Sequence, residues 1–300
     1  MRESAVDAIT GKSKGSAMEL PTKPQGLTNL EFVRNFTTYV FARRLAEGRS
    51  VLDVGCGTGH GAWLLADSGA TRTTAVDLDE ERVRMVSELC AAFPGFQASP
   101  MDAQRLDFQD GSFQLITCFE VIEHVPRPDM LLAGIQRILA PDGVAVISTP
   151  NRLVRLLPFQ LPWNREHLRE YTLSGFRRTL ANHFPATTVF GTHGEPSLHG
   201  YYRELWRQRP LEAYVGSARR LAAAARRTVF GRRSGPLPTH GGALASRNSH
   251  SPLVDIPIPA PEGKSWPFHL AEPDEDCLNF FAVCGFDEAA VSAAAGTLKA

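Results

Sequence analysis

A run of alternating glycines, "VLDVGCGTGHG" at residues 51–61, limits the possible folds of this chain more than any other segment. The hydrophobic residues at its start predict a buried strand, and Gly55, Gly57 and Gly59 predict a tight turn that leads into a helix. Glycine lets a ligand approach the main chain closely, and the free N–H groups at a helix start favour an anion. Three glycines in five residues exceed what a turn requires, so we expect this loop to bind a nucleotide-like cofactor.

Strand-like and helix-like patterns alternate along the rest of the chain. The segments expected to form strands are 50–55, 71–79, 96–102, 112–120, 142–151, 186–194 and 276–286. Helix-like hydrophobic spacing separates most of them and also precedes the first, at 28–47. The alternation predicts an α/β fold, a doubly wound, mostly parallel seven-stranded sheet with an extra N-terminal helix. Ligands bind such sheets at the carboxyl ends of strands, where Asp77, Asp102 and Glu120 also fall.

Composition divides the chain into three parts. Residues 1–27 are polar and are expected to form a flexible tail, whereas 28–194 plus 277–300 are expected to form the main domain. Residues 195–276 are interpreted as a long insertion before the last strand, either a substrate-side cap or partly disordered. Its arginine-rich stretch 219–233 allows peripheral contact with an anionic membrane.

Charge and cysteine usage narrow the class of protein. The formal net charge is zero, which provides no overall attraction to nucleic acid or to a membrane. The five cysteines are scattered and form no C-x-x-C pair, a pattern typical of buried thiols in a reducing compartment. Neither a secretory signal nor a transmembrane segment is predicted, so a cytoplasmic location is expected.

The spacing of the glycines separates two kinds of nucleotide cofactor. The dinucleotide fingerprint is G-x-G-x-x-G, but the sixth residue counted from Gly55 is His60. Asp53, two residues before that glycine, would repel a pyrophosphate and would suit a ligand that carries an amino group. An NAD-dependent dehydrogenase, which shares an acid after the second strand, is therefore the less favoured class.

Four motifs follow one another along the chain: "VLDVGCGTG", "VDLD", "MDAQRLDFQDGSFQLITCFEVIEHV" and "LAPDGVAVISTPN". Their combination resembles the class I S-adenosylmethionine-dependent methyltransferase family. The resemblance covers roughly residues 30–190 and the last strand near 277–284. It implies a Rossmann-like fold with S-adenosyl-L-methionine as the cofactor.

The resemblance also implies a role for each polar residue at the strand ends. Asp53 and the glycine loop would bind the methionine portion, Asp77 would accept hydrogen bonds from the ribose hydroxyls, and Asp102 would accept one from the adenine amino group. The residues alone leave a solvated turn acid and a helix N-cap as the alternatives for Asp77 and Asp102. The implied cofactor-binding residues are Asp53, Gly55, Cys56, Gly57, Gly59, Asp77, Leu78, Asp102, Ala103 and Phe119.

The segment "FEVIEHV" is the expected catalytic centre. It places Glu120, Glu123 and His124 at i, i+3 and i+4, which share one face if the segment forms a helical turn. One interpretation makes His124 or a glutamate the general base that takes the proton of a substrate hydroxyl. A second makes the cluster a divalent-metal site, and a third makes it mainly structural.

The metal interpretation depends on a further resemblance. Small-RNA 2′-O-methyltransferases and ubiquinone-pathway O-methyltransferases show a similar E-x-x-E-H segment that holds Mg²⁺, and the RNA enzymes add a downstream histidine. This implies Glu120, Glu123, His124 and His167 as ligands. Two imidazoles are unusual for a hard cation, so Mn²⁺ or Zn²⁺ suits the set as well. The "EHLREYT" segment around His167 also resembles a lid or helix-cap element of bacterial methyltransferases, which is the structural alternative.

The expected acceptor is a small molecule. "NREHLREYT" resembles bacterial methyltransferases that act on sugars or secondary metabolites. We therefore expect O-methylation of a small-molecule, glycosyl or secondary-metabolite hydroxyl, without an obligatory nucleic-acid partner. The alternatives are a metal-dependent RNA 2′-O-methyltransferase and a non-catalytic cofactor-binding protein.

Overall fold

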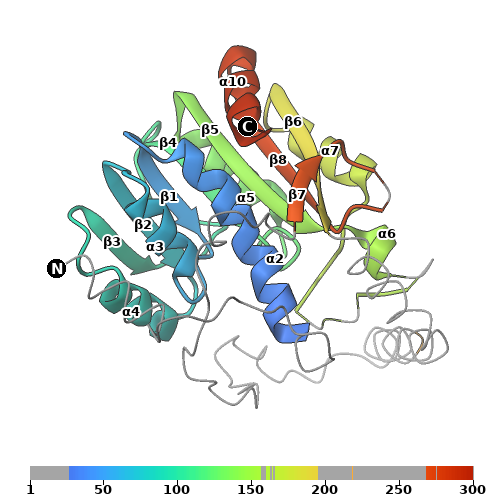
Figure 1. Cartoon of the computed structure of the whole chain (residues 1–300), viewed down its shortest axis with the longest axis horizontal. Helices are drawn as coiled ribbons and strands as arrows, with labels where there is room; N and C mark the ends of the chain where they lie inside the picture. The colour runs from blue at the N-terminus through green and yellow to red at the C-terminus, as the bar shows by residue number, and fades with distance from the viewer. Residues whose placement is uncertain are drawn as a thin grey trace, which may run out of the picture.

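The computed structural model describes residues 27–156, 160–162, 164, 166–194, 218, 268–274 and 276–299. The predicted tail, apart from residue 27, and most of the predicted insertion, including 219–233, lie outside the described residues. Within the described part, one eight-stranded sheet is covered by helices (Figure 1).

The elements follow the predicted alternation of strand and helix. The strands are β1 Ser50–Val54, β2 Arg72–Asp77, β3 Phe96–Pro100, β4 Phe113–Phe119, β5 Leu139–Pro150, β6 Ala186–Gly194, β7 Phe268–Ala271 and β8 Asn279–Gly285. The α-helices are α2 Leu27–Ala42, α3 His60–Asp67, α4 Glu80–Leu89, α5 Pro128–Ile138, α6 Arg152–Arg155, α7 Leu173–Ala181 and α10 Glu288–Lys299, and the 3₁₀ helix η2 is Arg43–Leu45.

The strand order across the sheet is β3-β2-β1-β4-β5-β8-β6-β7. The first five strands of this order pair in parallel, and β8 is antiparallel between β5 and β6. The predicted doubly wound, mostly parallel α/β fold is confirmed. Because β1 to β5 run in the same direction, their carboxyl ends meet at one edge of the sheet, where the polar motifs lie.

The sheet has one strand more than the seven predicted. The added strand is β7, which pairs antiparallel with Gly191–Gly194 at the end of β6. It belongs to the segment interpreted as an insertion before the last strand. A strand of four residues carries too little alternation to be recognised in sequence.

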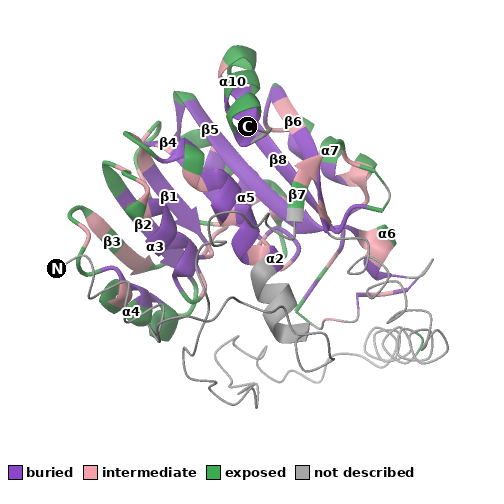
Figure 2. Ribbon diagram, viewed as in Figure 1, coloured by how far each residue is buried: buried purple, intermediate pink, exposed green. Residues whose placement is uncertain are grey.

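Side chains of successive strand residues face opposite layers. Leu52 and Ile116 pack in a core that α5 and α7 cover, whereas Val51 and Leu115 pack in a core that α2 and α10 cover. A third cluster joins α2, α3 and α4 over β2. The central strands are consequently buried on both faces along most of their length (Figure 2), as expected for a doubly covered parallel sheet.

Capping residues fix the helix starts that border the site. Asp79 caps α4, because its side chain accepts hydrogen bonds from the N–H groups of Glu81 and Arg82. Thr172 caps α7 in the same way, and Pro128 occupies the first turn of α5, where its missing N–H costs nothing. No helix among the described residues combines the length and apolar character needed to cross a bilayer.

Candidate active site

The glycine loop joins β1 to α3 at the carboxyl edge of the sheet. Gly55 and Gly59 have φ values of 74° and 84°, in the region that favours glycine. A Cβ at Gly55 would lie 2.4 Å from the Val121 side chain, and one at Gly59 would lie 2.7 Å from that of Val86. Both positions therefore require glycine for conformation and for space, and Gly59 leads directly into α3.

Asp77 ends β2 beside this loop. Its Oδ2 atom accepts a hydrogen bond from the Gly57 N–H at 2.9 Å, and its Oδ1 atom accepts one from the Asp79 N–H at 3.1 Å. Each carboxylate oxygen can accept a further hydrogen bond. The side chain is thus fixed against the loop with acceptor capacity left for a ligand, an arrangement that suits the predicted ribose contact better than a solvated turn acid.

Asp102 lies next along the same edge, after β3. The Met101 N–H donates to the Asp77 carbonyl at 2.8 Å, which joins the two acidic segments. Asp102 Oδ1 accepts hydrogen bonds from the main-chain and side-chain N–H groups of Gln104, at 2.9 and 3.2 Å. A turn follows Asp102, so the N-cap alternative does not apply. Leu78, 68% exposed, adds an apolar surface of the kind that a flat ring can cover.

Asp53 lies below the loop instead of on its surface. The side chain is fully buried, and its Oδ1 atom accepts hydrogen bonds from the hydroxyls of Thr117 at 2.7 Å and Tyr39 at 3.2 Å. Burial raises the pKa of Asp53 to about 7. Neither hydroxyl was identified from sequence, although both lie on predicted elements. A direct contact between Asp53 and the cofactor stays a prediction.

The other predicted cofactor residues lie within the glycine loop or at or just after the ends of other strands. Cys56 is buried, its N–H donates to the Val76 carbonyl at 3.0 Å, and burial raises the pKa of its thiol. Phe119, at the end of β4, packs edge to face on Tyr39 with 4.7 Å between ring centroids. Ala103 packs against the core that α5 covers. All five cysteines are buried and unpaired, as expected.

The "EVIEH" segment is not the helical turn that we expected. Residues 120–126 form an irregular turn, in which the His124 N–H donates to the Val121 carbonyl at 2.9 Å. Glu120 has φ 56°, a left-handed conformation that is uncommon for a residue with a side chain. The prediction that all three residues share one helical face is therefore wrong, because the segment forms no helix and Glu120 has a left-handed backbone conformation.

Glu120 is bound by three elements of the fold. Its Oε1 atom accepts hydrogen bonds from Asn279 Nδ2 at 2.9 Å and Ser148 Oγ at 3.1 Å, and Arg34 Nη2 lies 3.5 Å from its Oε2 atom. Arg34 lies on α2 and is itself buried. It was not identified from sequence, since the pairing depends on how α2 crosses the sheet.

Glu123, His124 and His167 come together as a separate cluster. One ligand atom from each lies within 4.8 Å of those of the other two, and the two imidazole rings meet edge to face at 4.6 Å. Glu123 is fully buried; its Oε2 atom accepts from Thr149 Oγ1 at 3.0 Å. Burial, and next the charge of Glu120, raise the pKa of Glu123 well above its ordinary value. Glu120 is not part of this cluster, so the structure brings together three of the four predicted ligand residues.

Hydrogen bonds fix the two imidazoles of the cluster. His124 Nδ1 lies 3.2 Å from the Glu166 carbonyl oxygen, and His167 Nδ1 lies 2.9 Å from Glu170 Oε1. Because a carbonyl can only accept, His124 Nδ1 carries the proton and Nε2 is left with a lone pair. Burial, and next the neighbouring His167, lower the pKa of His124, which favours the neutral ring.

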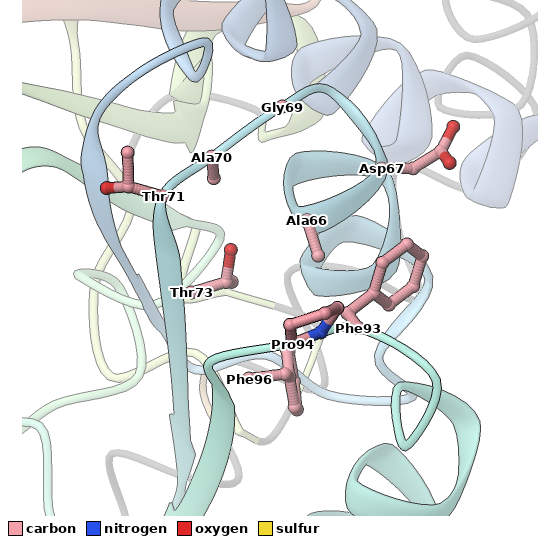
Figure 3. A pocket seen from close by; sticks show the side chains of 9 residues that line it. All are labelled: Ala66, Asp67, Gly69, Ala70, Thr71, Thr73, Phe93, Pro94 and Phe96. Atoms are coloured by element: carbon pink, nitrogen blue, oxygen red, sulfur yellow. The ribbon is translucent and has the colours of Figure 1, made fainter.

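A cavity of about 300 Å³ lies at the opposite edge of the sheet (Figure 3). It is formed by the end of α3, the starts of β2 and β3, and the rings of Phe93 and Phe96. Figure 3 shows the Asp67 carboxylate pointing away from the other lining side chains. None of the predicted site residues lines it. The chemistry predicted from sequence therefore belongs to the carboxyl edge and not to this cavity.

Comparison with known proteins identifies the family of this chain. A family model described as a methyltransferase domain matches residues 29–189, slightly more than half of the chain. A probable S-adenosylmethionine-dependent methyltransferase of Mycolicibacterium smegmatis is 34% identical over 142 residues, 47% of this chain and 54% of that relative. A ubiquinone biosynthesis O-methyltransferase of Xanthomonas oryzae pv. oryzae is 38% identical over 121 residues, 38% of this chain and 48% of that relative.

The chain spans about half the length of the curated relatives that it matches. Among solved structures, the YcgJ protein of Bacillus subtilis matches 84% of this chain and 99% of its own, with 17% identity and a TM-score of 0.48. The fold is assigned from the strand order of this chain and not from that similarity. The family model covers the glycine loop, the acids at the strand ends and the "EVIEH" turn together. The chain therefore belongs to the class I S-adenosylmethionine-dependent methyltransferase family.

Proposed function

We propose that this methyltransferase transfers the methyl group of S-adenosylmethionine to a hydroxyl oxygen of a small molecule, with His124 as the general base. The main support is the orientation of His124, whose Nδ1 atom is occupied by the Glu166 carbonyl and whose Nε2 atom is left to accept a proton. The similarity to ubiquinone biosynthesis O-methyltransferases supports oxygen as the acceptor atom.

The reaction requires one proton transfer and one displacement. As the acceptor hydroxyl attacks, its proton passes to His124 Nε2 and a new O–C bond forms. The S–C bond breaks at the same time, and the positively charged sulfur leaves as the neutral thioether of S-adenosylhomocysteine. The lowered pKa of His124 keeps the ring neutral at physiological pH and ready to accept the proton.

The proposal is tested with a small panel of acceptors. Protocatechuate represents catechols, methyl glucoside represents glycosyl hydroxyls, and a synthetic RNA duplex with free 2′-hydroxyls represents nucleic acid. Mass spectrometry of the products, with S-adenosylhomocysteine measured in parallel, should show a methyl ether on one small acceptor. The His124→Gln variant should lose at least about 100-fold in rate, the lower end of a general-base contribution. A matched control is His183→Gln, since His183 faces Asp129 near α5.

Three results would contradict the proposal. Cofactor binding without transfer to any hydroxyl would favour the non-catalytic alternative. Methylation of the RNA alone would favour the RNA enzyme. If the His124→Gln variant transfers the methyl group at the native rate, His124 is not the general base, but the assignment to the methyltransferases stands.

A metal-assisted version of the same transfer is the second candidate. The Oε1 atom of Glu123 is buried and has no hydrogen-bond partner among the described residues, and it belongs to the cluster with His124 and His167. Glu170 would orient His167 as carboxylates commonly orient metal-binding histidines. A donor set of two imidazoles and one carboxylate suits Mn²⁺ or Zn²⁺ better than Mg²⁺. A divalent ion there would lower the pKa of a bound hydroxyl.

Metal binding is tested without reference to turnover. Calorimetry with MnCl₂ on chelator-treated protein should give one site in the native chain and none in His167→Gln, with His183→Gln as the control. Equal heats in the native chain and in His167→Gln would exclude this cluster as a metal site. Unchanged transfer rates in excess EDTA would exclude a role for metal in the reaction.

A further inference from the structure

The segment 166–170 runs along the catalytic turn 120–126 and is bonded to it at several points. The Leu168 and Arg169 N–H groups both donate to the Glu123 carbonyl, at 2.9 and 3.4 Å. The Glu166 carbonyl in turn accepts from the His124 ring. The two segments are about forty residues apart in sequence, so their alignment depends on these contacts and not on local chain geometry.

The Arg169 guanidinium adds a second set of contacts to the same turn. Its Nη1 atom donates to the carbonyls of Ile122, at 3.4 Å, and of Val125. Its Nη2 atom donates to the Pro126 carbonyl at 2.9 Å. Three carbonyls that flank Glu123 and His124 on both sides are therefore held by one side chain.

The chemistry of these contacts requires arginine in particular. A guanidinium presents several N–H donors in a rigid plane, whereas a lysine ammonium is a compact charge on a flexible stem. Arg169 forms no ion pair with a carboxylate of the described residues. Its donors are directed at main-chain oxygens of the turn instead, so the contact fixes the backbone of the turn.

We propose that Arg169 is a positioning residue of the methyl transfer, which holds the turn that carries Glu123 and His124 against His167. The proposal deepens the proposed function and depends on it, because it assigns Arg169 to the orientation of the general base. Arg169 acts through His124 and needs no contact with the cofactor or the acceptor. Loss of the guanidinium would leave the glycine loop in place and would release the turn.

Two variants and one control test the proposal. Arg169→Lys keeps the charge and removes the planar donor set, and Arg169→Gln keeps one planar amide without charge. Arg177→Lys is the matched control, since Arg177 is exposed on α7. With S-adenosylhomocysteine bound, ¹⁵N spectra of labelled histidine at one fixed pH report the tautomer of His124, whose signals are identified by their absence in His124→Gln.

The native chain and Arg177→Lys should both show His124 protonated at Nδ1. In Arg169→Lys the signals should move toward the tautomer mixture of a free imidazole. With the acceptor found in the panel, kcat should fall roughly 10- to 100-fold while KM for S-adenosylmethionine stays within about twofold, as for a misplaced catalytic group. Arg169→Gln should lie between the native chain and Arg169→Lys, because its amide donates in one plane.

Opposite results would overturn the proposal in distinct ways. A folded Arg169→Lys variant with the native tautomer and native kcat would show that the Arg169 guanidinium does not position His124. Failure of both Arg169 variants to fold would make Arg169 a structural requirement and not a positioning residue. If the native chain transfers no methyl group to a hydroxyl, the proposed function fails, but the histidine spectra still decide whether Arg169 orients His124.

Discussion

The Tyr39 hydroxyl lies 3.2 and 3.3 Å from the two carboxylate oxygens of Asp53. Tyr39 belongs to α2, whereas Asp53 belongs to β1, two residues before the glycine loop. The same tyrosine ring packs on Phe119 at the end of β4. This side chain therefore connects α2 to the glycine loop and to the strand that precedes the turn 120–126.

The pH dependence of stability should report the buried Asp53. Its pKa in the folded chain, about 7, lies above the ordinary value of 3.8, so the folded state binds the proton more tightly than the unfolded state. This stabilisation is fully present below about pH 4 and is lost as the pH rises to about 7. Asp53→Asn should therefore gain stability relative to the native chain over that range, by up to about 4 kcal/mol at 1.36 kcal/mol per pKa unit.

Calorimetric unfolding of the native chain and of Asp53→Asn between pH 4 and pH 8 measures the difference in their free energies of unfolding. The contributions of the other titratable groups are common to the two proteins and cancel. Thr117 can donate to the Oδ1 atom of asparagine as it does to that of Asp53. A difference that stays constant with pH would show that Asp53 is ionised throughout the range.

Gly61→Ala should displace Tyr39. A Cβ at Gly61 would lie 2.1 Å from the Tyr39 ring, which Asp53 and Phe119 prevent from moving aside. Overpacking of this kind costs about 1–3 kcal/mol, so the melting temperature and the affinity for S-adenosylhomocysteine should both fall. The matched control is Gly134→Ala in α5, where the nearest atom is 3.6 Å away and helix propensity favours alanine by up to about 1 kcal/mol. If Gly61→Ala and Gly134→Ala change the melting temperature and the affinity equally, a clash between the residue 61 side chain and the Tyr39 ring is contradicted.

Asp77→Asn should weaken cofactor binding. The amide keeps the size of the side chain but replaces one acceptor oxygen by an NH₂ donor. That NH₂ group cannot accept a hydrogen bond, so either the bond from the Gly57 N–H or the predicted bond from a ribose hydroxyl is lost. Losing hydrogen bonds to a charged group costs about 1.5–3 kcal/mol, equivalent to a roughly 10- to 150-fold rise in Kd for S-adenosylhomocysteine. Calorimetry measures the change, and exposed Asp67→Asn at the opposite edge is the control. Unchanged affinity in Asp77→Asn would argue against the ribose contact.

The rate of methyl transfer should rise with pH through a pKa below 6.5. Only the neutral imidazole can accept the proton, and burial and then His167 lower the pKa of His124. The rate should therefore reach its plateau by neutral pH, and the acid limb should disappear in His124→Gln. In His167→Gln the midpoint should move upward, toward the ordinary value of 6.5, because a neighbour that helps to lower the pKa of His124 is gone. These profiles are recorded in EDTA, and a midpoint above 6.5 in the native chain would contradict His124 as the base.

Much of the fold could be predicted because its signals are local. A buried strand, glycines with positive φ and a helix start follow each other within residues 50–67, and a strand followed by a helix recurs in β2 with α4 and in β4 with α5. Parallel strands then bring their carboxyl ends to one edge without further information. The nearness of Asp77 and Asp102 to the glycine loop follows from that rule.

The orientation of the catalytic groups could not be predicted in this way. The spacing of Glu120, Glu123 and His124 suggests one helical face, but Glu120 turns toward Asn279, 159 positions away, and leaves the other two with His167. A side chain of this kind has several rotamers and several potential partners. Which one it adopts depends on the segments that pack beside it.

The sequence by itself determined the α/β architecture, the glycine loop and the family, since these depend on periodicity and turn chemistry within short windows. Only the tertiary structure decided that Tyr39 supports Asp53, that Arg169 holds the turn 120–126 and that β7 extends the sheet. Each of these contacts joins segments remote along the chain, and its stability comes from burial and hydrogen bonding that exist only after the sheet and its helices have packed.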